Sequence, residues 1–192
     1  LSGGWGAGRV VLSLGVSFTN FSLRNTFKKG AWTPLPAGDG QTLNLRAQTN
    51  GRYFQSYSMS FVEPWLGGRK PNSLSFSAYF SRQSNGETKY VERSGERIRN
   101  PNLQQLDIIG ATLGLGKRLT WPDDYFILRQ NLSYQNYELR NFSSGGVVFD
   151  FVNGNSNVLS YQCQISRNSV DQPFFARTGS DISFSVKATP PF

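Results

Sequence analysis

The sequence has no histidine and a single cysteine, Cys163. Without histidine the commonest general base and metal ligand is missing. A lone cysteine can form neither an intramolecular disulfide nor a cysteine-based metal cluster. No nucleophile–base pair can be assembled from what remains, so we predict that the chain is not an enzyme. We likewise predict no cofactor and no metal site.

Charge and long apolar runs are also scarce. Charged residues make up 17% of the chain, against roughly 25% in an ordinary soluble domain. No stretch approaches the roughly 18–20 apolar residues of a membrane-spanning helix. The mean hydropathy of −0.41 would by itself indicate a soluble protein. Membrane β-barrels alternate apolar and polar residues and average to mild hydrophilicity, so both classes stay open at this point.

The net charge of +8 could indicate an acidic partner. The basic residues are scattered, however, and the densest cluster, residues 82–99, is interleaved with Glu87, Glu92 and Glu96. We predict a solvated loop of mixed charge there, with contact to anionic lipid headgroups as the alternative. No nucleic-acid partner is predicted.

Two short motifs suggest chemistry but do not support it. The run Gly4-Trp5-Gly6-Ala7-Gly8 resembles a dinucleotide fingerprint, but the position of its third glycine falls on Arg9 and no helical pattern follows. The carboxylates of Asp123 and Asp124 follow a proline, in a setting where aspartate commonly stabilises a turn.

Apolar side chains recur at every second position, which is the periodicity of β-strands. The alternation keeps a consistent phase in eight segments, at residues 12–19, 43–48, 56–61, 73–80, 109–116, 128–135, 159–166 and 182–188. The sequence therefore predicts an all-β, antiparallel architecture.

The connections between these segments fall into two alternating kinds. One kind combines proline or glycine with aromatic residues, which we predict to be interfacial anchors: Trp32, Trp65, Trp121, Phe174 and Phe175. The other kind, at 50–52, 83–104 and 141–157, holds no tryptophan, and 83–104 is predicted to be a loop. Because strands alternate in direction, the aromatic connections would all lie at one end, as a membrane girdle requires.

The alternation has two physical interpretations. In a soluble lipocalin-like barrel the apolar face points inward, whereas in a membrane barrel it faces lipid and the polar face lines a wet lumen. The segregated aromatics favour the transmembrane β-barrel. Its lumen-facing residues would then include Arg46, Arg129 and Lys187. These could make the lumen anion-selective, or they could pair with acidic groups on strands or a plug outside this sequence.

Residues 3–9 look like the end of one further strand, which brings the number of strands to about nine. Single-chain bacterial outer-membrane barrels have an even number of strands, and an open sheet would leave unpaired edges in lipid. The chain also begins without methionine or a signal peptide. We therefore expect residues 1–192 to be one partial transmembrane β-barrel domain, cut from a longer protein.

Several runs resemble the BamA family of the bacterial surface antigen superfamily. Residues 20–25, 36–41 and 61–68 are similar to the first barrel hairpins of that family. Residues 167–173 and 177–180 are similar to the turn before its ninth strand, although Ala176 and Arg177 occupy a stretch where the family usually has a proline. The resemblance extends over essentially the whole chain, in order.

The resemblance implies the first nine strands of a sixteen-stranded barrel, with periplasmic POTRA domains and the C-terminal strands absent. It implies an integral protein of the bacterial outer membrane, with the aromatic turns on the periplasmic side. The function implied is insertion of outer-membrane proteins through a lateral seam by strand templating. The partners implied are the outer-membrane bilayer and lipopolysaccharide, unfolded outer-membrane proteins, and accessory assembly lipoproteins that bind the POTRA domains. The seam-edge strand would comprise Gly4, Trp5, Gly6, Ala7 and Gly8.

Other functions stay open beside the insertase. A polypeptide-translocating relative of the same superfamily would share the barrel and differ in its substrate. A passive porin would lack upstream POTRA repeats. A soluble lipocalin-like binding protein would fold without detergent, with its apolar residues inside.

Overall fold

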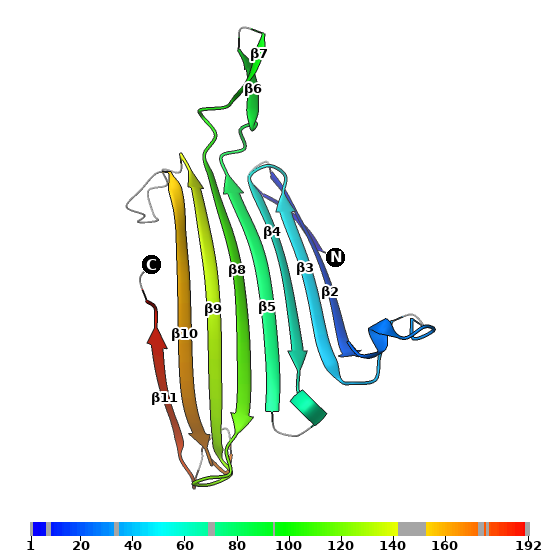
Figure 1. Ribbon diagram of the computed structural model, residues 1–192, viewed down its shortest axis with the longest axis vertical. Coiled ribbons are helices and arrows are strands. Elements are labelled where there is room, and N and C mark those ends of the chain that lie inside the picture. The colour runs from blue at the N-terminus through cyan, green and yellow to red at the C-terminus, as the bar shows by residue number, and fades with distance from the viewer. Residues whose placement is uncertain are drawn as a thin grey trace.

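The computed structural model describes residues 2–6, 9–32, 35–68, 72–93, 95–141, 153–172, 175 and 177–190. Nine strands form one antiparallel sheet, in the order β1-β2-β3-β4-β5-β8-β9-β10-β11 (Figure 1). Their bounds are β1 Ser2–Gly6, β2 Arg9–Phe21, β3 Gln41–Asn50, β4 Phe54–Glu63, β5 Asn72–Ser84, β8 Gln105–Arg118, β9 Phe126–Arg140, β10 Gly154–Asn168 and β11 Asp181–Ala188. The all-β antiparallel prediction is confirmed, and each of the eight alternating segments lies within one strand.

The sheet is open in the described chain, with β1 and β11 at its two edges. Closure into sixteen strands stays a prediction. Two short 3-10 turns, η1 (Asn25–Phe27) and η2 (Leu66–Gly68), lie in connections. None of the helical segments within the described ranges is both long and apolar enough to cross a membrane.

The cross-strand register sorts the side chains onto two faces. Phe76 of β5 pairs with Leu113 of β8, which pairs with Leu132 of β9. The adjacent pair, Thr112 and Ser133, points to the opposite side, because successive side chains in a strand alternate between faces. We call the two sides the apolar face and the polar face. The register agrees with the phase of the sequence pattern across the sheet, because a slip of one residue would exchange the faces.

Glycines on the polar face of β8 let side chains of the neighbouring strands lie over its backbone. A Cβ added at Gly110 would lie 2.4 Å from Cε1 of Tyr79, whose ring covers the glycine. The Tyr79 hydroxyl accepts a hydrogen bond from Nε2 of Gln135 (2.9 Å), and Oε1 of Gln135 accepts one from the Tyr137 hydroxyl (2.8 Å). An aromatic ring over a cross-strand glycine is one of the devices that fix strand register.

The two ends of the sheet differ in their connections. The lower end in Figure 1 carries the connections 22–40, 64–71, 119–125 and 169–180, and we call it the lower rim. The upper end carries the turn 51–53, the segment 85–104 and the β9–β10 connection, and we call it the upper rim. Gly51, with φ +57, supplies the left-handed conformation that the tight β3–β4 turn needs.

The prediction of a loop over 83–104 is wrong in two respects. β5 continues to Ser84, and the segment contains a separate hairpin formed by β6 (Tyr90–Arg93) and β7 (Glu96–Arg99), which projects beyond the sheet (Figure 1). Glu92 pairs across this hairpin with Arg97, whose guanidinium lies 4.9 Å from the centre of the Tyr90 ring. Each strand has four residues and one aliphatic side chain, so no two-residue apolar repeat could reveal it.

A small core holds this hairpin to the upper rim. Leu103, Leu106 and Leu139 are among the few hydrophobic side chains that the described chain buries. Leu106 and Leu139 pair across β8 and β9 on the polar face. The Asn100 side chain, also buried, donates a hydrogen bond to the carbonyl of Thr88 (3.0 Å). At this level the sheet is covered on its polar side, whereas lower down both faces are open.

Candidate functional site

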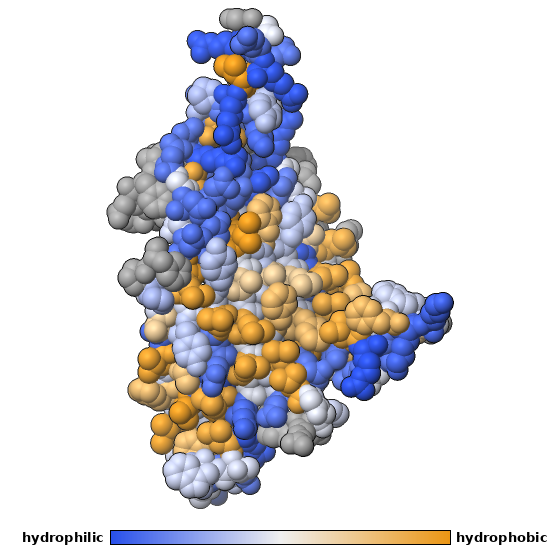
Figure 2. All heavy atoms as spheres, in the orientation of Figure 1, coloured by the Kyte–Doolittle hydropathy of each residue, from blue (hydrophilic) through white to orange (hydrophobic). Residues whose placement is uncertain are grey.

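The apolar face is the largest feature of the molecule. Its side chains are uncovered: Leu14 of β2 is 49% exposed and Phe184 of β11 is 67% exposed. Figure 2 shows hydrophobic side chains gathered over the middle and lower parts of the strands, with hydrophilic side chains above them. Soluble monomers rarely expose a continuous apolar area of this extent. A surface of this kind marks a site of contact with a membrane or with another protein.

Charged residues bound the apolar face at the upper rim. Arg82 of β5, Asp107 of β8 and Glu138 of β9 pair side by side, and Arg82 and Asp107 lie two residues beyond Phe80 and Ile109, the last apolar positions of their strands on this face. The Arg82 guanidinium binds Asp107 through two 2.8 Å hydrogen bonds, and Nε2 of Gln105 donates to the same carboxylate at 2.6 Å. Arg140 pairs with Glu138 at 2.5 Å. We call Arg82, Gln105, Asp107, Glu138 and Arg140 the upper charged row.

Sequence reasoning missed this row, although a signal was present. The two-residue periodicity that places Phe80 and Ile109 on the apolar face continues to Arg82 and Asp107. Opposite charges at the same end of two strands of matched phase would have predicted the pair. The sequence alone does not show that β5 and β8 are neighbours in the sheet, because residues 85–104 lie between them in the chain.

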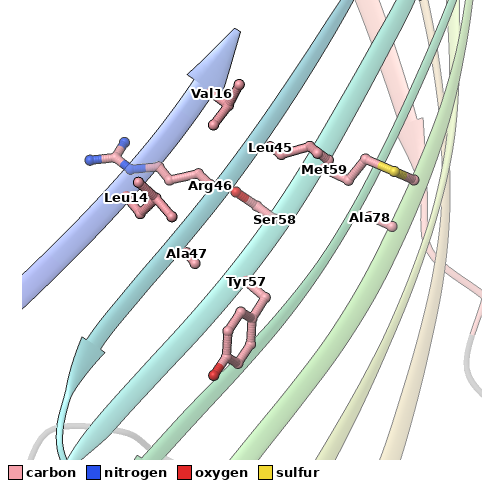
Figure 3. Close-up of a pocket in the computed structure, with 9 residues that line it drawn as sticks. All are labelled: Leu14, Val16, Leu45, Arg46, Ala47, Tyr57, Ser58, Met59 and Ala78. Atoms are coloured by element: carbon pink, nitrogen blue, oxygen red, sulfur yellow. The ribbon is translucent and has the colours of Figure 1, made fainter. Parts of the chain in front are cut away.

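A shallow hollow of about 470 Å³ lies on the apolar face over β2 to β5 (Figure 3). The small side chains of Ala47 and Ala78 leave the space, and larger ones from neighbouring strands surround it: Leu14, Val16, Leu45, Tyr57 and Met59. Its lining is nearly all hydrocarbon, so it suits acyl chains rather than a polar ligand.

The polar face is held together by hydrogen bonds between short side chains. Ser17 donates to Oδ1 of Asn44 (2.5 Å), and Nδ2 of Asn44 donates to Ser60 (3.2 Å), which links β2, β3 and β4. Thr112 and Ser133 form a similar bond between β8 and β9 (3.1 Å). This face is therefore built to contact water or a polar occupant.

The three basic residues predicted to face a lumen all lie on the polar face. Arg46 pairs with Gly15 and Ser58, and a hollow of about 410 Å³ lies beside it over β2 and β3. Arg129 lies opposite Gly116, and Lys187 opposite Gln162. Within the described residues none of the three has an ion pair. That this face lines a lumen stays a prediction.

At the lower rim, a hydrogen-bonded network joins the segments that carried the family resemblance. Ser22 is fully buried and donates to Oδ2 of Asp39 (2.5 Å). The Gln41 side chain accepts from the amide of Leu23 (2.7 Å) and donates to Oε2 of Glu63 (2.6 Å). The runs 20–25, 36–41 and 61–68, on which the resemblance rests, thus connect β2, β3 and β4 at one end.

Arg167 joins two other lower connections. Its Nε donates to Oδ2 of Asp123 (2.9 Å), in the β8–β9 connection, and its NH1 donates to Ser169 (2.7 Å), in the β10–β11 connection. Partial desolvation raises the pKa of the Asp123 carboxyl, but the Arg167 hydrogen bond and charge and the amide of Tyr125 outweigh it and hold this pKa below its usual value. Asp123 therefore has a structural partner, in agreement with a turn residue.

The β10–β11 connection closes around Asp171 and Gly179. Hydrogen bonds from the backbone amides of Thr178 and Arg177 lower the pKa of the Asp171 carboxyl, against a smaller opposing effect of desolvation. Gly179 has φ +96, and a Cβ there would lie 2.1 Å from the carbonyl oxygen of Ser169. The second resembling segment therefore contains an acceptor and a glycine that the turn requires.

The predicted interfacial aromatics lie in the lower connections, as far as they are described. Trp32, Trp65 and Trp121 occupy three of these connections, with Trp121 82% exposed. Nε1 of Trp32 donates to the carbonyl of Thr26 (3.2 Å). Phe175 lies in the fourth connection and is almost fully exposed, whereas Phe174 lies outside the described residues. Their role as anchors stays a prediction.

The edge strand differs in extent from its prediction. β1 comprises Ser2–Gly6 and pairs with residues 9–13 of β2, so Gly4, Trp5 and Gly6 belong to the edge. Ala7 and Gly8 lie outside the described residues. Arg9, expected at the end of the edge strand, instead begins β2 and pairs with Gly6. Trp5 pairs with Val10 near the upper rim, so tryptophan is not confined to the lower rim.

The acidic residues that the structure describes do not gather at one place. Within the described ranges, no group of three or more cysteine, aspartate or glutamate side chains is placed to hold a metal ion. The carboxylates in ion pairs are each engaged by an arginine at a rim of the sheet. The arrangement offers two chemically opposite faces and an edge strand.

Comparison with known proteins gives one family. No curated protein matches the sequence. Among solved structures, the crystal structure of BamA from Haemophilus ducreyi lacking POTRA domains 1–3 is similar, with a TM-score of 0.49 and 16% sequence identity. The match covers 95% of this chain and 31% of that chain, so the chain spans about a third of the length of that relative. The sequence model of the Omp85 superfamily domain matches residues 37–192, well over half of the chain, and the chain therefore belongs to the Omp85 superfamily, whose members are outer-membrane insertases and translocators.

Proposed function

We propose that the chain is the N-terminal part of an outer-membrane β-barrel insertase of the BamA type, which folds and inserts other outer-membrane proteins. The observation that carries the proposal is an edge strand, β1, beside a sheet with one uncovered apolar face, in a member of the Omp85 superfamily. The family match begins at residue 37, so the assignment of β1 depends on its place in the sheet.

The chemistry of β1 supports templating. An edge strand presents unpaired N–H and C=O groups to which an incoming strand can be added. Three of the five residues of β1 are glycines, which add no side-chain packing and lose more conformational entropy when they become ordered. A strand of this composition is held less firmly than its neighbours, as a seam that opens and closes requires.

We propose the partners on the same grounds. The apolar face would contact the outer-membrane bilayer, and the upper charged row would lie at the level of lipopolysaccharide headgroups. Unfolded outer-membrane proteins would pair with β1. Accessory assembly lipoproteins would bind POTRA domains, with the lower rim on the periplasmic side. The protein would be a noncatalytic, integral component of a Gram-negative outer membrane, without a cofactor.

Site-specific crosslinking to a stalled substrate tests the edge assignment. In a Cys163→Ser background of the full-length protein, Gly6→Cys places a thiol on β1, and Gly15→Cys places one on β2. Gly15 is a matched control, because its Cβ would meet nothing within 4 Å and the substitution is sterically free. We expect disulfide formation between position 6 and a cysteine in the terminal strand of the substrate. Crosslinking at position 15 without crosslinking at position 6 would overturn the assignment.

A channel function is the second candidate, because Arg46, Arg129 and Lys187 on the polar face lack acidic partners among the described residues. A porin or a polypeptide-translocating relative would use this face as a positively charged passage. Planar-bilayer conductance of the full-length protein separates the alternatives. A large, steady, anion-selective conductance that decreases with Arg46→Gln, without crosslinking at position 6, would favour the channel over the insertase.

A further inference from the structure

A second cavity lies at the lower part of the apolar face, between β5, β8 and β9 and next to η2. It has a volume of about 230 Å³. Its lining includes Ser73 and Gly116 of the polar face, three leucines, and three longer side chains that can bind a polar group: Leu66, Leu115, Leu128, Asn72, Lys117 and Gln130. We call it the amphiphilic notch. Neither the sequence pattern nor the seam hypothesis accounts for its polar lining.

The register places the polar residues of the notch on the lipid-facing side. Lys117 pairs with Asn72 on one side and with Leu128 on the other. Gln130 pairs with Leu115 and with Cys163, so its immediate neighbours in the row are not polar. All of them therefore share the face of the exposed leucines. A glutamine amide in such a row has an energetic cost in hydrocarbon unless it is hydrogen-bonded.

Neither polar group is satisfied by the protein in the part of the chain that the structure describes. The half-buried Gln130 side chain has no hydrogen-bond partner there, although its backbone pairs in the sheet. The exposed ammonium of Lys117 has no ion pair. The basic residues at other positions beside the apolar face, Arg82, Arg140 and Arg167, all pair with carboxylates. Lys117 thus presents an uncompensated positive charge at the lower edge of this face.

The vertical order of the groups matches that of a phospholipid. Lys117 is the penultimate residue of β8 at the lower rim, close to the connections that contain Trp65 and Trp121. Gln130 lies one step of two residues higher, about 7 Å further from the rim. Above it, Leu113 and Leu132 pair in hydrocarbon surroundings. From the rim upward the order is cation, amide and aliphatic, and a phospholipid presents its phosphodiester, ester carbonyls and acyl chains in the same order.

We propose that the amphiphilic notch binds one phospholipid of the leaflet at the lower rim. The Lys117 ammonium and the Asn72 amide, which are at the same level, bind the phosphodiester, and the Gln130 amide donates a hydrogen bond to an ester carbonyl. The acyl chains extend beyond the small cavity, along Leu113 and Leu132. The proposal goes beyond the insertase function: it depends on a lipid-facing apolar face, and only the assignment to the periplasmic leaflet depends on the proposed orientation.

Native mass spectrometry of the full-length protein in detergent tests the site, with phosphatidylglycerol as the added probe. A lysine near a membrane surface contributes about 1 kcal/mol to the binding of an anionic lipid, so Lys117→Gln should weaken retention of the lipid about fivefold. Lys187→Gln is the matched control, because it removes the same charge from the polar face. It should leave lipid retention unchanged. Lys117→Arg keeps the charge and should retain the lipid.

Other outcomes would overturn the proposal. Equal retention by Lys117→Gln and the unchanged protein would show that the notch does not hold the phosphate. An equal loss in Lys187→Gln would indicate binding by net charge alone. If Lys117→Gln does not assemble into a heat-modifiable barrel, Gln130→Leu replaces it, with an expected loss of about threefold from one missing hydrogen bond. Crosslinking at position 6, measured in the same variants, reports on the insertase function independently.

Discussion

The connections at the lower rim and at the upper rim of the sheet are stabilised by different interactions. At the lower rim, long irregular connections are held by side chains that accept hydrogen bonds from backbone amides, as the buried Ser22 and Gln41 and the exposed Asp171 do. At the upper rim, the β3–β4 turn needs only Gly51, and the sheet is held by the upper charged row and a small leucine core. The segments that resemble a known family lie at the lower rim. There, side chains determine the path of the backbone.

Substituting one glycine at each rim tests this difference. We expect it to give the largest difference in the free energy of unfolding. Gly179→Ala would place a Cβ 2.1 Å from the Ser169 carbonyl oxygen at a φ of +96, and should destabilise the protein by more than about 2 kcal/mol or prevent assembly. Gly51→Ala, at a φ of +57, stays in the left-handed region and its Cβ meets nothing within 4 Å, so it should cost only about 1–2 kcal/mol. Urea unfolding in liposomes measures both values. Equal effects would show that the lower connection is no more constrained than the upper turn.

Removing one ion pair at each rim should give a smaller difference in the free energy of unfolding. The Asp107 carboxylate is 8% exposed and accepts two hydrogen bonds from Arg82 and one from Gln105. Asp107→Asn removes a buried charge that accepts three hydrogen bonds and leaves the partly exposed Arg82 without its charge partner, and should cost about 1–3 kcal/mol. Asp123, with its side chain 35% exposed, resembles a surface pair, so Asp123→Asn should cost less than about 1 kcal/mol. The same unfolding assay ranks them, and the reverse order would contradict the assigned burial.

Acidification should destabilise the β10–β11 connection at the lower rim, and this should be the smallest of the three predicted effects. The carboxyl pKa of Asp171 lies below its usual value in the folded chain because the amides of Thr178 and Arg177 bind the charged form. A lowered folded pKa contributes stability above the unfolded pKa, near 4, and this stability is lost as the pH falls through the folded value. Hydrogen exchange at the amides of Thr178 and Arg177, corrected for the intrinsic rate, should accelerate below about pH 4. In Asp171→Asn these amides should exchange at a rate without this pH dependence.

Several features of the fold could be predicted from the sequence because they depend on local periodicity. Leu74, Phe76, Ala78 and Phe80 alternate with polar residues, and this pattern predicts both a strand and its two faces. The β6–β7 hairpin could not be found in the same way, because each of its strands contains one aliphatic residue. The position of the edge strand was predicted approximately, but the start of β2 at Arg9 was not. A glycine-rich segment contains too few apolar residues to show a two-residue alternation.

The candidate sites show a similar division. The polar-face positions of Arg46, Arg129 and Lys187 followed from strand phase alone. The pairing of Arg82 with Asp107 depends on β5 and β8 becoming neighbours across the projecting hairpin. The amphiphilic notch likewise requires Asn72, Lys117 and Gln130 from three strands at adjacent levels. Residues of this kind are unremarkable individually, and only their juxtaposition suggests a ligand.

The sequence by itself determined that this chain forms strands with one apolar and one polar face, because alternate side chains of a strand must point in opposite directions. It also determined which connections carry aromatic residues. Only the tertiary structure decided which strands pair, at what register, and therefore which charges meet. The physical reason is that pairing brings together residues that are distant in the sequence: Arg82 meets Asp107, Arg167 meets Asp123, and Lys117 remains uncompensated beside Gln130.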